Sequence, residues 1–218
     1  MALVLQLVGL VLGLLSWGLT SSCTSSHHWK VKSQMESVSA SQWTFEGLWM
    51  SCAAASTGST QCSRFKTVLG LPVHVQVCRG LMILALVLDL VSGLVSALGL
   101  KCTRLSGVSD QTKAQLTLSG GVLYILSGLS SLTAVSLYAS RVIQDFYSPA
   151  YGGVRFELGA ALYQGWSGAG LALLGGSLLC CSLRNQRHSA PPHYSVKFTS
   201  DSQNIYRAPS ESSTKAYV

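Results

Sequence analysis

Two cysteine residues, Cys52 and Cys62, have the spacing of a hairpin closed by a disulfide. The residues between them are rich in Ser and Thr and include Gly58, which is typical of a turn. A disulfide that closes a loop of this length would stabilise the fold by about 2–3 kcal/mol. Because such bonds persist in oxidising compartments, the pair predicts that this part of the chain lies outside the cell. Cys23 and Cys78 remain without an assigned partner.

No motif of a catalytic or metal centre is present. The sequence contains no HExxH, GxSxG, P-loop or CxxC pattern. His27 and His28 are adjacent, whereas paired metal ligands on a helix are four positions apart. We therefore predict a protein that is not an enzyme and that has no cofactor and no metal site.

Charged side chains lie on both sides of the cysteine pair. Lys30 and Lys32 alternate with Trp29 and Val31, which is the period of a half-buried strand, so both lysines would lie on one face. Positions 42–45 and 48–53 are further strand candidates. The charged residues that matter here are four bases and two acids: Lys30, Lys32, Arg64, Lys66, Glu36 and Glu46.

The elements that must position these residues belong to a membrane protein. Of the 218 residues, 48% are hydrophobic and only 11% are charged, where about 25% is usual in soluble domains. The net charge of +7 does not indicate nucleic-acid binding, because the 15 basic residues are dispersed between apolar blocks.

Four apolar blocks each reach the roughly 20 residues that a helix needs to cross a bilayer. Their small residues recur at four-residue spacing, as in Gly9 and Gly13, which would let helices pack closely. The first block could be a cleaved signal peptide, but it lacks a charged leading region, so we expect it to be retained. The predicted spans are 1–20, 80–100, 116–140 and 158–183.

Four spans place both termini on the same side of the membrane, and the cysteine pair makes that side cytoplasmic. The first extracellular segment would then be 21–79 and the second 141–157, with a cytoplasmic loop at 101–115. The residues from 184 to 218 contain few aliphatic side chains, which predicts a disordered cytoplasmic tail.

The pattern in the first extracellular segment resembles the claudin family of tight-junction proteins. It consists of Trp29, the run Gly47-Leu48-Trp49, and the two cysteines, followed by Arg79 at the start of the second span. The Gly-Leu-Trp run and the cysteines alone also occur in peripheral myelin proteins and calcium-channel gamma subunits.

Other parts of the chain agree with the resemblance. Positions 145–149 and 155–159 are similar to the second extracellular segment of claudins, and the final Tyr217-Val218 is similar to their terminus. The stretches most similar to the claudin ten branch are Cys-Arg-Gly-Leu-Met at 78–82, Lys-Cys-Thr at 101–103 and Tyr-Ala at 138–139.

The resemblance implies a fold of four transmembrane helices with a small extracellular antiparallel β-sheet, a membrane α+β class. The sheet would have four strands from the first segment and one from the second. In channel-forming claudins its side chains line a pore between cells, and the motif tryptophans are structural. Near Cys62 this chain has bases where cation-preferring claudins have acids, so Lys30, Lys32, Arg64 and Lys66 predict anion preference, which Glu46 would reduce. The alternative is that these bases are ordinary solvated residues.

The resemblance also implies assembly with other claudins, laterally and across the cell gap. Val68, on a short helix after the sheet, would dock into a pocket of a neighbouring copy. The side chains expected to form that pocket or to serve adhesion are Phe146, Tyr147, Tyr151 and Leu158. Anchoring in the aromatic belt of the membrane is the competing interpretation of these aromatic residues.

The cytoplasmic side carries candidate attachment sites. Cys102, Cys180 and Cys181 lie at inner span ends, where thiols are palmitoylated, although buried reduced cysteine is the alternative. A terminal valine with a free carboxylate suits a PDZ groove. With the resemblance, Tyr217 and Val218 imply zonula occludens scaffolds as partners.

Asp89 departs from the family pattern because it lies in the middle of the second span. A charge there costs at least about 2.5–3.5 kcal/mol. We expect a protonated Asp89 that hydrogen-bonds to a serine of the bundle; the alternative is a residue without a function.

Together these observations predict a plasma-membrane protein of the tight junction that polymerises and forms an anion-preferring channel for small ions. The alternatives are a barrier-forming claudin without a pore, and an auxiliary subunit of another channel.

Overall fold

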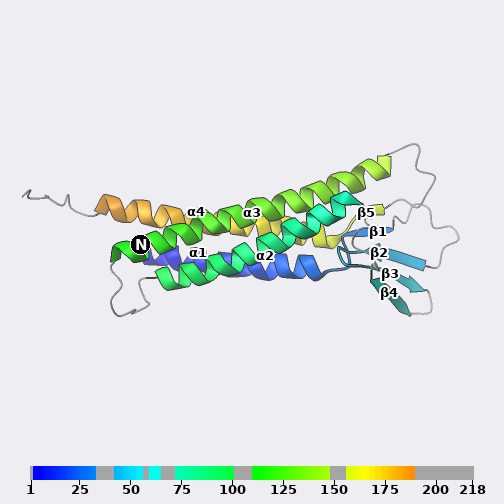
Figure 1. Cartoon of the computed structure of the whole chain (residues 1–218), viewed down its shortest axis with the longest axis horizontal. Helices are drawn as coiled ribbons and strands as arrows, with labels where there is room; N and C mark the ends of the chain where they lie inside the picture. The colour runs from blue at the N-terminus through cyan, green and yellow to red at the C-terminus, as the bar shows by residue number, and fades with distance from the viewer. Residues whose placement is uncertain are drawn as a thin grey trace, which may run out of the picture.

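The computed structural model describes residues 2–32, 42–55, 59–64, 72–100, 110–147 and 156–189. Four helices dominate it, and each is long and apolar enough to cross a membrane. They are α1 (Ala2–Ser25), α2 (Val73–Gly99), α3 (Asp110–Tyr147) and α4 (Ala160–Ser189). Figure 1 shows that the helices run alongside one another, with the N-terminus and the end of α4 at one end of the bundle and a small sheet at the other. The predicted four-helix bundle is therefore confirmed.

The helices are longer than the predicted spans. The second begins at Val73, directly after Pro72, whose backbone (ψ 138°) lies outside the helical region and makes it the N-cap. The prediction of a disordered tail from Arg184 is wrong for residues 184–189, which continue α4. Most of these residues are adequate helix formers, so the helix extends past the apolar block.

Small residues allow the helices to approach closely, as their spacing predicts. A Cβ atom at Gly175 of α4 would lie 2.8 Å from the carbonyl oxygen of Gly9 in α1. A Cβ atom at Gly176 would lie 2.6 Å from the carbonyl oxygen of Gly121 in α3. Both contacts are too short for any side chain, so glycine lets α4 pack directly against the backbones of two neighbours.

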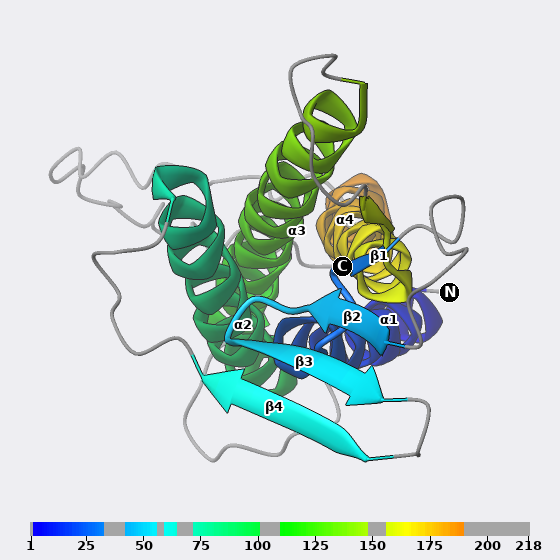
Figure 2. The same cartoon turned by 90° about the vertical axis from the view of Figure 1, so that its right-hand side faces the viewer.

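The sheet has five antiparallel strands in the order β4-β3-β2-β1-β5. Four come from the first extracellular segment, as labelled in Figure 2, and one comes from the second, as predicted. Their bounds are β1 (Lys30–Lys32), β2 (Gln42–Glu46), β3 (Met50–Ala55), β4 (Thr60–Arg64) and β5 (Phe156–Leu158).

A buried cluster joins the sheet to the outer ends of the helices. Trp29 and Leu48 come from the sheet side, and they pack with Met82 of α2, Tyr138 of α3 and Leu162 of α4. All five side chains are buried. Because this cluster contains residues from both parts of the molecule, it fixes the sheet relative to the bundle.

Candidate functional site

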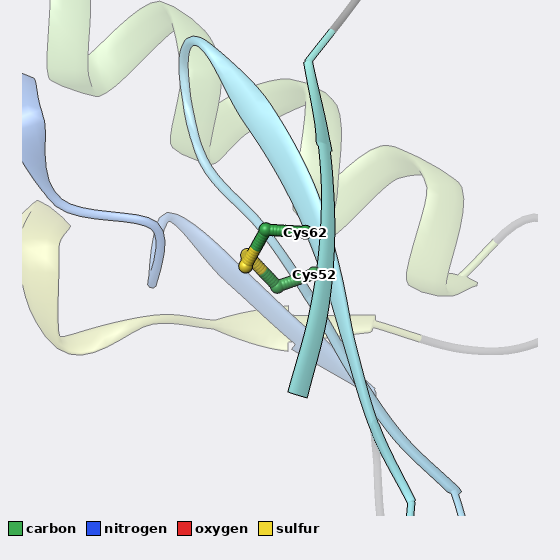
Figure 3. The surroundings of a disulfide bond; sticks show 2 residues. All are labelled: Cys52 and Cys62. Carbon is green, nitrogen blue, oxygen red and sulfur yellow. A yellow bond between two sulfur atoms is a disulfide. The ribbon is translucent and has the colours of Figure 1, made fainter. Parts of the chain in front are cut away.

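The predicted disulfide is present and joins two neighbouring strands. Cys52 of β3 and Cys62 of β4 are directly opposite each other in the register, with Cα atoms 4.1 Å apart. Figure 3 shows both side chains extending to the same side of the sheet. The bond therefore closes the β3–β4 hairpin at the middle of its ladder.

The tryptophans of the sequence motif anchor the sheet to α1. The buried Trp29 donates a hydrogen bond from Nε1 to the carbonyl oxygen of Cys23, at 2.9 Å. Its ring packs edge-on against Tyr138, with the ring centroids 5.0 Å apart. Trp49 donates from Nε1 to the carbonyl oxygen of Thr24, at 3.0 Å. Both indoles thus bind carbonyl groups in the last turn of α1, where the helix itself offers no further N–H donors. The carbonyl of Cys23 also accepts from the backbone N–H of Ser26, at 3.3 Å.

Arg79 at the start of α2 fixes the turn between β2 and β3. Its Nε donates to the carbonyl oxygen of Leu48 at 2.7 Å, and its guanidinium lies over the Trp49 ring at 4.9 Å. Gly47 is required at this turn because a Cβ atom there would lie 2.6 Å from the carbonyl oxygen of Ser26. All five motif residues named from the sequence therefore meet at one junction, where their role is structural.

The register divides the charged residues between the two faces of the sheet. Residues directly opposite each other in antiparallel strands point to the same face, and successive residues alternate. Lys30 pairs with Glu46, and Lys32 lies two positions further along β1. These three residues share one face, which we call the lysine face.

Arg64 lies on the other face, together with the disulfide. It is two positions beyond Cys62, so its side chain points to the same side as that cysteine. We call this the disulfide face. The sequence grouped Arg64 with the two lysines as charges of one surface, and the register separates them. Lys66 and Glu36 lie outside the described residues.

The charge of Lys30 is compensated. Its Nζ lies 2.8 Å from Oε2 of Glu46, and both side chains are about a quarter exposed. Nζ also lies 4.6 Å from the centroid of the Phe156 ring. The sequence predicted that Glu46 would reduce the positive field of the bases, and in the structure Glu46 pairs with Lys30.

A hollow of about 380 Å³ lies on the lysine face across β2, β3 and β4. Its charged lining residue is Glu46, and most of the others present hydroxyl, amide or methyl groups. The lining residues are Thr44, Glu46, Ser51, Cys52, Ala53, Gln61, Cys62 and Ser63. A polar hollow of this kind suits hydrated ions or water better than an apolar ligand.

A second cavity of about 350 Å³ lies beside the sheet, between the end of α3, β5 and the start of α4. We call it the aromatic groove. It is lined by Val142, Ile143, Phe146, Tyr147, Phe156, Glu157, Leu158 and Tyr163. Three of these, Phe146, Tyr147 and Leu158, were expected from the sequence to form one pocket, and the structure brings them together.

The sequence reasoning missed several residues of the aromatic groove. Val142 and Ile143 precede Phe146 by four and three positions, so helical spacing would have placed them on the same side of α3. Tyr163 was missed because it belongs to the first turns of another helix. Val68 and Tyr151, the other expected assembly residues, lie outside the described residues.

The other cysteines in the described part of the chain are free, and their environments differ. Cys23 and Cys78 are buried, and the Cys78 thiol donates to the carbonyl oxygen of Ala134 at 3.3 Å. On α4, Cys180 is half-buried and Cys181 is exposed. Cys102, Tyr217 and Val218 lie outside the described residues. Within the described part of the chain, no three His, Cys, Asp or Glu side chains form a group that could hold a metal ion.

Comparison with known proteins matches the architecture. The sequence profile described as the PMP-22/EMP/MP20/Claudin family matches residues 2–179. Claudin-19 of Mus musculus is 43% identical over 180 residues, which cover 82% of this chain and 80% of that relative. Claudin-6 of Homo sapiens is 40% identical over 218 residues, covering 98% of each chain. Claudin-1 of Rattus norvegicus is 37% identical over 216 residues, again 98% of each.

Proposed function

The chain belongs to the claudin family, so it is a multipass membrane protein of tight junctions and not an enzyme; from this premise we propose that it forms an anion-preferring channel between neighbouring cells. Claudins assemble with one another and bind scaffold proteins, and this chain shares those general properties with its family.

The observation that supports the anion preference is the charge on the lysine face. Lys30 and Glu46 form an ion pair, so their fields largely cancel beyond a few ångströms. Lys32 shares this face, and no acidic side chain of the described residues lies within ion-pair distance of it. Among the described residues, one positive charge per chain is therefore left uncompensated on the surface that would border the pore.

Such a charge acts only in a narrow passage. At physiological salt the screening length is about 8 Å, so a lysine on an open surface has little effect on the ions nearby. A polymer would place several copies of Lys32 around one passage. A ring of like charges raises the local anion concentration and repels cations.

The experiment measures dilution potentials across a leaky epithelial cell layer that expresses the protein. We expect the ratio of Cl⁻ to Na⁺ permeability to rise on expression and to fall again with Lys32→Ala. Arg64→Ala is the matched control, because Arg64 lies on the disulfide face, and it should change the ratio less. Cation preference of the wild-type protein would overturn the proposal.

A barrier function is the second candidate, and the pairing of Lys30 with Glu46 favours it because it reduces the free charge on the lysine face. The charged residue that lines the hollow is Glu46, whose charge is already paired. A barrier claudin would raise the electrical resistance of the cell layer without changing ion preference. An auxiliary subunit would change conductance only when another channel is co-expressed, so the same measurement separates the three functions.

The aromatic groove supports lateral assembly. Tyr147 is 78% exposed, and Phe146 packs edge-on against it with ring centroids 5.3 Å apart. An apolar knob such as Val68 of a neighbouring copy would bury these rings. Because valine is short, it would fill only part of a cavity of about 350 Å³, so we infer weaker docking than a longer side chain would give.

We also propose that the cytoplasmic side of the protein is attached to lipid and to scaffold proteins. Cys181 is exposed and Cys180 half-buried near the inner end of α4, and accessible thiols at this depth suit palmitoylation. Cys102 is a further candidate from its sequence position. The terminal Tyr217-Val218 would bind a PDZ domain of zonula occludens scaffolds, where the valine carboxylate meets backbone amides.

We further propose that the chain is nearest in character to the claudin ten branch. The support is three short stretches: Cys-Arg-Gly-Leu-Met at 78–82, Lys-Cys-Thr at 101–103 and Tyr-Ala at 138–139. The relatives described above are claudins 19, 6 and 1, and they establish the family without selecting this branch.

A further inference from the structure

Asp89 is a buried acid that the proposed channel does not use. It lies near the middle of α2, inside a membrane span, and is 1% exposed. Neither of its carboxyl oxygens accepts a hydrogen bond from a described residue. An ionised carboxylate in such a place would lose its hydration without any replacement, which is among the most costly arrangements in a protein.

No basic side chain of the described helices can neutralise this acid. Arg79 precedes it by ten residues on α2, which is about 15 Å along the helix, and its Nε binds the carbonyl oxygen of Leu48. Lys113 and Arg141 of α3 each lie fourteen residues from Ser127, the α3 residue beside Asp89, or about 21 Å. Helix α1 contains no Lys or Arg, and α4 contains none from residue 160 to residue 182.

Two serine hydroxyls lie around the carboxyl group, and each of them donates its proton to a backbone carbonyl. Ser16 of α1 and Ser127 of α3 lie beside it. Ser16 donates to the carbonyl oxygen of Gly168 at 2.8 Å, and Ser127 donates to the carbonyl oxygen of Ala85 at 2.8 Å. A serine hydroxyl has a single proton, so while each serine donates to its backbone carbonyl it can meet the carboxyl group only as a hydrogen-bond acceptor.

Tyr124 of α3 is the titratable neighbour of Asp89 in this region. Its ring is fully buried, and its hydroxyl has no hydrogen-bond partner among the described residues. The ring fits here because Gly13 and Gly93 have no side chain: a Cβ atom at Gly93 would lie 3.1 Å from the hydroxyl oxygen, and one at Gly13 would overlap the ring. The tyrosine thus fills the space between α1 and α2.

We propose that Asp89 is a proton-binding site at the centre of the helix bundle. The carboxyl group is held as the neutral acid, and its proton is donated to the hydroxyl oxygen of Ser16 or Ser127. Its other oxygen is then available to the Tyr124 hydroxyl. This arrangement removes the negative charge from the membrane centre. The carboxyl group would donate one hydrogen bond to a serine and accept one from Tyr124, and these bonds would join three helices.

A proton fits this place better than a small cation such as Na⁺. A metal cation needs room for several oxygen ligands at their own distances, whereas a proton needs none. The close contacts of Tyr124 with Gly13 and Gly93 show that its ring fills the space between α1 and α2, in the neighbourhood of Asp89.

Infrared spectroscopy of the full-length protein in lipid nanodiscs at pH 7 tests the inference. We expect the carbonyl stretching band of a neutral carboxylic acid, shifted on exchange of H₂O for D₂O. The band should be lost in Asp89→Asn and kept in Glu157→Gln, since Glu157 is an exposed acid on β5. Absence of the band in the wild-type protein, or its persistence in Asp89→Asn, would overturn the proposal.

Two further arms keep the test decisive. If Asp89→Asn does not fold, aspartate labelled with ¹³C at the side-chain carboxyl should shift the band in the wild-type protein, and an unshifted band would contradict us. In the second arm, thermal unfolding is compared in NaCl and in choline chloride. Stabilisation by Na⁺ that Asp89→Asn abolishes, together with a carboxylate band, would identify a sodium site instead of a proton site.

Discussion

At the scale of single residues, Glu46 determines how much positive charge the sheet presents. It lies opposite Lys30 in the β1–β2 register and forms an ion pair with it at 2.8 Å. Exposed ion pairs contribute little to stability, commonly about 0–1 kcal/mol. The importance of this pair is therefore electrostatic: it halves the net charge that two lysines would otherwise give the lysine face.

Replacing Glu46 with Gln should increase anion preference. The substitution keeps the shape of the side chain but releases the charge of Lys30, so the lysine face would carry two positive charges in place of one. We expect a higher Cl⁻ to Na⁺ permeability ratio in dilution-potential measurements. Glu157→Gln is the control, because residue 157 pairs with Val31 and so lies on the disulfide face. An equal rise in both variants would mean that only the total charge matters.

Gly47 is a second single-residue constraint, and it acts on stability. Gly47→Ala would place a methyl group 2.6 Å from the carbonyl oxygen of Ser26 and 2.7 Å from Cα of His27. Backbone atoms cannot move aside easily, so we expect a loss of roughly 1–3 kcal/mol, as in other overpacked sites. Thermal unfolding in detergent measures it. Gly80→Ala should have little effect, because that position faces open space; similar losses in both variants would contradict the packing argument.

At the scale of elements, the outer end of α3 determines the assembly surface. The helix runs to Tyr147, so Val142, Ile143 and Phe146 extend along β5 and complete a groove that a shorter helix would leave open. On the other side of the sheet, β4 is an edge strand with every side chain exposed. Unpaired edges of this kind can pair with another chain.

Phe146→Ala should reduce the assembly of junction strands. The change removes an aromatic wall of the groove and leaves the bundle core intact, because Phe146 is only partly buried. Freeze-fracture electron microscopy of transfected cells would show fewer or shorter strands. Leu137→Ala, at an exposed position of α3 away from the groove, is the control. Strands of normal number and length in Phe146→Ala would rule out this role of the groove.

At the scale of the whole molecule, the bundle has two different ends, and our proposal places one end in the cytoplasm and the sheet in the gap between cells. In Figure 1 the N-terminus and the end of α4 lie together, opposite the sheet. This polarity follows from the even number of spans. It lets one chain combine extracellular assembly with attachment to cytoplasmic scaffolds.

Deleting Tyr217 and Val218 should weaken retention at junctions without preventing assembly. The deletion removes the carboxylate and side chain that a PDZ groove would bind, while the described fold ends before them. We expect faster fluorescence recovery after photobleaching at cell contacts. Deletion of two residues inside the tail, such as 203–204, is the control. Unchanged recovery in the terminal deletion would exclude PDZ attachment as the anchor.

The sequence was sufficient for the four-helix bundle, the disulfide and the existence of the strands that surround it, but not for the bounds of the helices. Continuous apolar runs can satisfy their own backbone in a membrane only as helices or closed barrels, so the bundle follows from local composition. Cys52 and Cys62 are close in the chain, and their pairing needs only a hairpin. The motif around Gly47 was also informative, since its residues meet at one junction of the fold.

What the tertiary structure decided involves residues that are far apart in the chain. The ion pair of Lys30 with Glu46, the placement of Arg64 on the opposite face, and the entry of Tyr163 into the aromatic groove all depend on register or on helix packing. A shift of one residue in a strand moves every side chain to the other face, and charge counts along the sequence contain no such information. The sequence therefore determined which charges and aromatic residues the chain carries, and only the fold decided which of them share a surface.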